Sequence, residues 1–139
     1  MTPHQIDLVQ KTFAQVKPIA SAAAEMFYAR LFVLDPSLRG MFRNDMGKQG
    51  AMLMSMIGAA VNGLRNLEAL SPVVRQLGAR HVKYGVKTEH YATVGDALLW
   101  TLEQGLEDDF TPEVRDAWAA AYGLLSEVMQ LGAMEAQPA

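Results

Sequence analysis

The apolar positions of this chain recur at steps of three and four residues, the period of an amphipathic helix. A first helix is predicted to start at Thr2-Pro3, where a hydroxyl N-cap precedes a proline whose missing N–H costs nothing, and to end or bend at Pro18. Thr2 and Gln5 also have the spacing of a capping box. One face of this helix carries Ile6, Val9, Phe13 and Val16.

The next segments follow the same period. An alanine-rich and mostly buried second helix is predicted from Ile19 to Leu34, because Asp35-Pro36 cannot continue it. Pro36 to Met41 is predicted as a short helical corner, and Arg43 to Gly47 carries turn chemistry. Four further helical stripes are expected, from Leu53 to Leu64, from Val74 to Tyr84, from Tyr91 to Leu106 and from Val114 to Val128.

Local signals mark the ends of these later helices. Ser71-Pro72 and Thr111-Pro112 repeat the hydroxyl-proline start, Thr88 is expected to act as an N-cap, and Gly85 stands where a left-handed C-cap belongs. The segment from about residue 132 to 139 is expected to be a disordered tail. Since no stretch alternates with period two and no repeat or linker is present, the sequence predicts one all-α domain over residues 1–139.

Composition narrows the chemistry further. Half of the 139 residues are hydrophobic, which suffices for one core, and there is no cysteine, which excludes disulfides, thiolate metal sites and thioether attachment of haem. The start of the chain lacks the features of a signal peptide and no long apolar run follows, so a cytoplasmic protein without membrane contact is expected. The net charge is −3 and the basic residues are scattered along the chain, which argues against nucleic acid as a partner.

The three histidines differ in their sequence context. His4 and His90 lie in the first turns of predicted helices and are expected at the surface or its boundary. His81 falls on the same predicted face as Val74 and Leu77, so its imidazole must be buried or given a partner. It could be a core histidine bonded to a backbone carbonyl or a neutral ligand of haem iron, and periodicity alone does not choose between them.

Other candidates are equally ambiguous when taken singly. Tyr28 could place a hydroxyl in a cavity or at the surface, and Gln49 could contact a ligand or only water. The methionines at 52, 54 and 56 are typical of core filling, and only Met56 continues the apolar stripe. The acidic group Glu103, Glu107, Asp108 and Asp109 is expected to be a solvated helix end.

Taken together, several motifs resemble those of single-domain bacterial haemoglobins and of the globin domain of flavohaemoglobins. The resemblance runs from about residue 5 to about residue 130, and its segment 77–99 is highly specific. The matching motifs are Phe-Tyr at 27–28, Asp-Pro-x-Leu-x-x-x-Phe at 35–42, Gln49 with Leu53, Leu-Gly-x-Arg-His-x-x-Tyr-Gly-Val at 77–86, His-Tyr-x-x-Val-Gly-x-x-Leu-Leu at 90–99, Ala-Trp at 117–118 and Ala-Tyr-Gly at 121–123.

This resemblance implies a globin fold, a three-on-three helical sandwich that encloses haem b without a covalent bond. His81 would be the protein ligand of the iron. Tyr28, Gln49 and Leu53 would lie on the side where gas binds, with the phenol and the amide donating hydrogen bonds to the ligand. The iron is expected to be five-coordinate when ferrous. The haem pocket is expected to include Phe42, Met56, Leu77, Tyr84, Val86, Tyr91 and Val94.

Two departures from the flavohaemoglobin pattern affect function. No flavin- or NADH-binding segment follows the globin region, so turnover is expected to need a separate reductase. The resemblance also implies a glutamate that acts with the tyrosine matched by Tyr91 on the iron-ligating histidine, and Ala133 stands in its place. Neither Glu127 nor Glu135 has the matching register.

Three functions remain as hypotheses. The first is a protein, monomeric or weakly dimeric, that reversibly binds oxygen, and also nitric oxide or carbon monoxide, for storage, delivery or scavenging. The second is a nitric oxide dioxygenase that detoxifies nitric oxide with an external reductase. The third, a sensor or structural module, is weaker because no output domain is attached and the pocket residues are in place.

Overall fold

The structure, a computed structural model, describes residues 1–42 and 45–136. In these residues all regular structure is helical, as predicted. The six α-helices are α1 (Pro3–Val16), α2 (Ala20–Leu34), α3 (Met46–Asn62), α4 (Leu67–Lys83), α5 (Thr88–Leu106) and α6 (Pro112–Ala136). Four short 3-10 segments link them: η1 (Lys17–Ile19), η2 (Pro36–Met41), η3 (Gly63–Arg65) and η4 (Glu107–Asp109).

Most predicted helix ends are confirmed, because they depend on local chemistry. The Thr2 hydroxyl accepts a hydrogen bond from the Gln5 N–H in a complete capping box. The Thr111 hydroxyl accepts one from the N–H of Val114 at 3.2 Å, so α6 begins at the predicted proline. Gly85 has φ +86°, the left-handed conformation predicted for it.

The starts of α4 and α5 differ from the prediction. Helix α4 begins at Leu67 rather than at Ser71-Pro72, because Asn66 caps it by accepting from the Ala69 N–H, and Pro72 lies inside the helix. Thr88 is the first residue of α5 and not its cap, since the ring of His90 accepts the N–H of Lys87 at 2.9 Å.

The C-terminal boundary also differs. Helix α6 continues to Ala136, into the segment expected to be a disordered tail. An ion pair between Arg75 and Glu135, at 3.2 Å, joins its last turns to α4. Of the predicted turn at Arg43 to Gly47, residues 43–44 lie outside the described residues.

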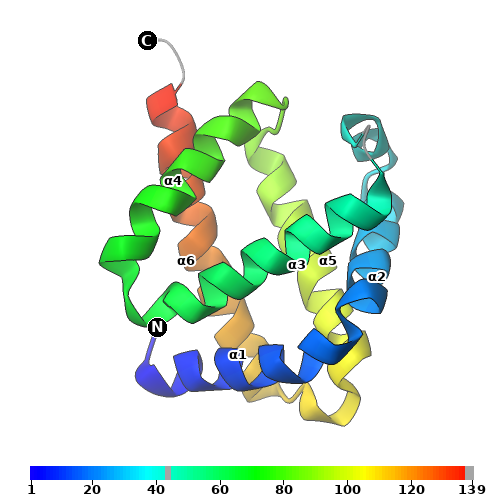
Figure 1. Ribbon diagram of the computed structural model, residues 1–139, viewed down its shortest axis with the longest axis vertical. Coiled ribbons are helices and arrows are strands. Elements are labelled where there is room, and N and C mark those ends of the chain that lie inside the picture. Colours follow the sequence, from blue (N-terminus) through cyan, green and yellow to red (C-terminus); the bar gives the residue numbers. More distant parts are fainter. Residues whose placement is uncertain (43–44, 137–139) are drawn as a thin grey trace.

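Helices α3 and α4 form one layer and α5 and α6 the other, around a central space, with α1 and α2 along two edges (Figure 1). Helices α1, α5 and α6 pack on one another, and α2 packs on α3. Between the layers the most extensive contact joins α4 to α6, and α2 also packs on α5. Figure 1 shows α3 and α4 in front of α5 and α6, and α3 and α4 scarcely touch each other. Residues of both helices line a cavity that lies between them.

Two apolar clusters hold the layers together. In the larger one, Phe13 packs at 6.5 Å from Trp118, whose indole N–H donates to the hydroxyl of Thr12 at 2.8 Å. The second cluster surrounds Phe27 and Leu31. Within the described residues, no helix has both the length and the apolar character needed to cross a membrane.

Candidate haem pocket

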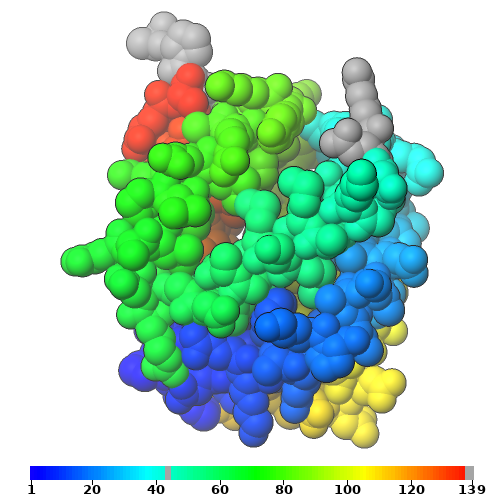
Figure 2. Space-filling view, viewed as in Figure 1, coloured from blue at the N-terminus to red at the C-terminus, as the bar shows by residue number. Residues whose placement is uncertain are grey.

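A cavity of about 300 Å³ lies between the two layers and receives residues from every helix except α1. Its size is at the lower end of ordinary ligand pockets, and its walls are almost wholly apolar. Figure 2 shows the molecule hollowed between α3 and α4, the two helices that flank the opening. The cavity is therefore suited to a large apolar group that enters between these helices.

His81 is the residue on which the site is centred. It lies in the last turn of α4, lines the cavity and has an Nδ1 atom that is buried without a protein partner. Its backbone carbonyl accepts the N–H groups of Tyr84 and Val86 at 3.1 and 3.0 Å, which fixes the end of the helix beneath the ring. Burial, and then the charge of Arg80, lower the pKa of His81, so the imidazole is neutral. A neutral imidazole with a free nitrogen can coordinate a metal ion.

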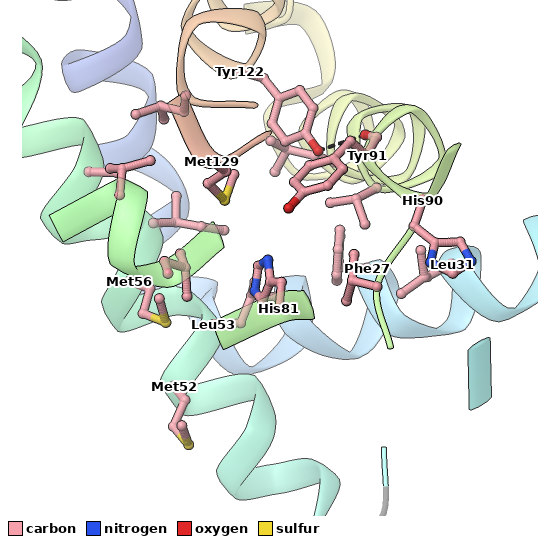
Figure 3. Close-up of a pocket in the computed structure, with 18 of the residues that line it drawn as sticks. Phe27, Leu31, Met52, Leu53, Met56, His81, His90, Tyr91, Tyr122 and Met129 are labelled. Carbon is pink, nitrogen blue, oxygen red and sulfur yellow. Dashed lines mark hydrogen bonds between the residues drawn. The ribbon is translucent and has the colours of Figure 1, made fainter. Parts of the chain in front are cut away.

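Tyr91 faces His81 across the cavity. Figure 3 shows its hydroxyl directed toward the imidazole, and the ring centroids are 6.3 Å apart. The hydroxyl is buried without a partner, and burial raises the pKa of Tyr91. The Tyr122 hydroxyl donates to the Tyr91 carbonyl at 2.6 Å and so holds this part of α5 against α6. Two partnerless polar atoms in one apolar cavity are costly, which indicates that a bound group completes the site.

Tyr28 and Gln49 enter the cavity from α2 and α3, on the other side from α4. Burial raises the pKa of Tyr28, and a hydrogen bond with the Gln49 side chain acts in the opposite direction. At pH 7 Tyr28 is therefore a neutral phenol and a hydrogen-bond donor. Phe42 lies edge-on to Tyr28, with ring centroids 5.2 Å apart, and this contact fixes one aromatic wall.

The structure brings together most of the residues that the sequence singled out. Those that line the cavity are Tyr28, Phe42, Gln49, Leu53, Met56, Leu77, His81, Val86, Tyr91 and Val94. Tyr84 does not join them, because α4 ends at Lys83 and the turn at Gly85 leaves the Tyr84 side chain 66% exposed. The expectation that Tyr84 contacts the cofactor is thus corrected.

Several lining residues were missed or misjudged. Met52 lines the cavity as Met56 does, although only Met56 was expected on the apolar face. His90 is half-buried, as expected for a boundary residue, and it also contributes to the cavity wall while its Nδ1 accepts the N–H of Lys87. Tyr122 and Met129 enter from α6, where nothing in the local pattern distinguishes them from core residues.

The residues present fit haem. The cavity offers a neutral imidazole with a partnerless nitrogen, aromatic and aliphatic walls, and hydroxyl and amide donors on the other side. Large apolar burial of this kind is what retains a cofactor that has no covalent bond to the protein.

Comparison with known proteins supports this interpretation. The chain is 32% identical over 131 residues to a flavohemoprotein of Vibrio cholerae and 34% identical over 132 residues to one of Bordetella parapertussis. These matches cover 92% and 93% of the chain but only 33% of each relative, so the chain spans about a third of their length.

Solved structures show the same fold. A bacterial globin from Campylobacter jejuni superposes with a TM-score of 0.84 at 27% identity, covering 96% of this chain and 97% of that one. An engineered carbene transferase made from a predicted nitric oxide dioxygenase of Rhodothermus marinus gives 0.87 at 23% identity, over 97% and 94% of the two chains. The expected globin fold is thereby confirmed. The family model described as Globin matches residues 25–129, and the chain therefore belongs to the globin family.

Proposed function

We propose that the cavity holds haem b, with His81 as the protein ligand of the iron, and that the protein binds oxygen reversibly for storage, delivery or scavenging. The observation that carries this proposal is the half-buried, neutral His81 imidazole, whose buried Nδ1 has no protein partner and which lines an apolar cavity. The absence of cysteine from the sequence supports non-covalent retention. Globin membership and the flavohemoprotein relatives support haem as the occupant.

The residues on the other side of the cavity determine which ligands are favoured. When bound, ferrous haem supplies the electron density that a diatomic ligand accepts. The Tyr28 hydroxyl and the Gln49 amide donate hydrogen bonds there, and such bonds in an apolar pocket favour a polarised ligand over an apolar one. Oxygen is therefore preferred relative to carbon monoxide, and nitric oxide also fits. Position 49 carries an amide rather than an imidazole, so this residue would donate a hydrogen bond to the ligand rather than bind the iron itself.

A second candidate function is nitric oxide dioxygenation with an external reductase. The flavohemoprotein relatives and the similarity to a protein named as a nitric oxide dioxygenase favour it. The diagnostic result is nitrate formation whose rate rises with added reductase. A stable oxygen complex with no nitrate formation would leave ligand binding as the function.

The first experiment compares absorption spectra of the haem-supplied protein in ferric, reduced and air-exposed forms. We expect a Soret band that survives gel filtration and a reversible change on exposure to air. His81→Ala should lose both, whereas His90→Ala, which alters the other histidine of the cavity, should keep them. If His81→Ala bound haem with an unchanged spectrum, the assignment of His81 would be wrong.

A further inference from the structure

The charges of this protein are divided between its two sides. Residues 36–88 contain eight of the 12 lysines and arginines and only two acidic residues. Residues 89–139 contain ten of the 15 acidic residues and a single arginine. The first segment forms α3 and α4 and the second forms α5 and α6. Basic residues occur along the whole sequence, but α3, η3 and α4 together carry five of them and lie on one side of the molecule (Figure 1): Lys48, Arg65, Arg75, Arg80 and Lys83.

The basic side is the side on which the cavity opens. Figures 1 and 2 view the molecule from the face that α3 and α4 cover, with α5 and α6 behind. Lys48 precedes Gln49 of the cavity wall, Arg80 precedes His81, and Lys83 lies in the same turn of α4. All three basic side chains belong to exposed residues.

These cations are available to a partner. In the described part of the chain, Lys48, Arg80 and Lys83 form no ion pair with the protein. By contrast, Arg65 in η3 forms an ion pair with Asp7, and Arg75 in α4 forms one with Glu135. Lys48, Arg80 and Lys83 thus place positive charge that is not in an ion pair beside residues of the cavity wall.

The rim of the opening is apolar. Met52 and Met56 lie one helical turn apart on α3, line the cavity and are 59% and 40% exposed. An apolar patch surrounded by cations has the layout of a protein-binding surface, in which methionine is enriched at the centre and polar residues form the periphery. Nucleic acid is a less suitable partner, because a long flexible polyanion would extend from the basic face to the acidic side, which repels it.

We propose that this basic face, defined by Lys48, Arg80 and Lys83 with the rim of Met52 and Met56, docks an electron-donor protein whose surface is acidic around its own redox group. The proposal rests on the function proposed above, since one electron passes from the reduced donor to ferric haem iron, which becomes ferrous while the donor is oxidised by one electron. Docking at the opening brings the donor to the edge of the cavity. Attraction between the basic face and the acidic donor speeds their encounter. Repulsion between the donor and the acidic side of the globin turns the basic face toward the donor.

The test compares two double variants that have equal net charge. Lys48→Glu with Lys83→Glu reverses two cations of the basic face. Lys17→Glu with Arg115→Glu reverses two exposed cations in η1 and α6, away from the opening. Haem absorbance and carbon monoxide binding are measured first for both variants, and both should match the unaltered protein because none of the four side chains lines the cavity.

The probe is a plant-type ferredoxin, an acidic one-electron carrier. Its affinity is measured by binding of the haem-loaded globin to immobilised ferredoxin, and electron transfer is measured by stopped-flow reduction of the ferric protein. We expect both to weaken as salt rises from about 0.02 M to about 0.3 M, and to fall about tenfold or more at low salt in the Lys48/Lys83 variant only.

Three results would overturn the proposal: no salt-sensitive binding of ferredoxin, equal losses in the two double variants, or salt-sensitive self-association or anionic-vesicle binding that exceeds the binding of ferredoxin. Any of these, with normal spectra and carbon monoxide binding, would leave the proposed function intact. A failure to bind haem would instead refute the proposed function itself.

Discussion

The crossing of α4 and α6 is so close that adding one methyl group at Gly78 should force the helices apart. A β-carbon at this position would overlap the carbonyl oxygen of Met129 and lie 2.6 Å from its carbonyl carbon. Gly132 makes the reciprocal approach to the backbone of Arg75. Because carbon atoms prefer separations of about 3.5–4.0 Å and a backbone obstacle cannot rotate away, Gly78→Ala requires a displacement of roughly 1 Å.

The expected cost follows from two opposing effects. Overpacking costs about 1–3 kcal/mol, and the rigid obstacle places Gly78→Ala at or above the upper end of that range. Replacing a glycine in a helix by alanine stabilises the folded state by about 1 kcal/mol. We therefore expect a net destabilisation of about 2 kcal/mol or more. Gly123 of α6 is the matched control, since a β-carbon there meets nothing within 4 Å and Gly123→Ala should stabilise by about 1 kcal/mol.

Unfolding in urea, followed by the helical circular dichroism of the haem-free protein, measures both free energies without the contribution of cofactor binding. Haem transfer to an acceptor protein gives a second readout, because Gly78 lies one turn before His81 and a displaced α4 carries that ligand with it. Faster haem loss is expected in Gly78→Ala and unchanged loss in Gly123→Ala. Equal stabilisation by both substitutions would show that the crossing is looser than the structure indicates.

Three other predictions each concern a single substitution. Tyr28→Phe should speed oxygen dissociation about 10- to 100-fold in flash or stopped-flow measurements, because a buried hydrogen bond to a partly charged acceptor is worth about 1.5–3 kcal/mol; an unchanged rate would show that this hydroxyl does not reach the ligand. Burial lowers the pKa of His81 in the folded state, so the unfolded chain takes up a proton on this residue first as the pH falls. The free energy of unfolding of the haem-free protein should therefore decrease below about pH 6.5 and stay level above it. His81→Leu should weaken this pH dependence. Thr12→Val leaves the buried Trp118 N–H without an acceptor and should lower the free energy of unfolding in urea by about 1–3 kcal/mol. Thr93→Val should cost much less, because the hydroxyl of this half-buried residue only donates to the Glu89 carbonyl of its own helix.

Helix ends were predictable from sequence where a single local signal was present, and not where two signals competed. Thr2-Pro3 and Thr111-Pro112 each had no rival and are confirmed. Around α4 both Asn66 and Ser71 could cap, and Asn66 prevails because the extra turn it adds outweighs the one backbone hydrogen bond that Pro72 cannot form.

The cavity shows the same division between local and long-range information. Apolar periodicity placed Met56, Leu77 and His81 on inward faces, whereas Gln49 and Leu53 were assigned to the pocket by the resemblance to bacterial haemoglobins. The residues of α6 were not, since Tyr122 and Met129 reach the cavity only through the close crossing of α4 and α6, which depends on glycines 54 residues apart. His90 is half-buried, as expected for a boundary residue, but its position in the first turn of α5 did not reveal that it also lines the cavity.

The surroundings of His81 favour ligand binding over oxidative catalysis. Raising the basicity of a metal-bound imidazole requires an anionic partner for its other nitrogen. Ala133 supplies none, and Glu135, two residues on, is engaged with Arg75 at the surface. The group that faces the ring is the Tyr91 hydroxyl, whose pKa is raised by burial, so at pH 7 it is a neutral phenol that cannot act as that anion. With a neutral phenol beside His81 and two hydrogen-bond donors at Tyr28 and Gln49, the haem pocket proposed above would stabilise a bound diatomic molecule more than it would activate one, which is why we propose reversible oxygen binding ahead of dioxygenation.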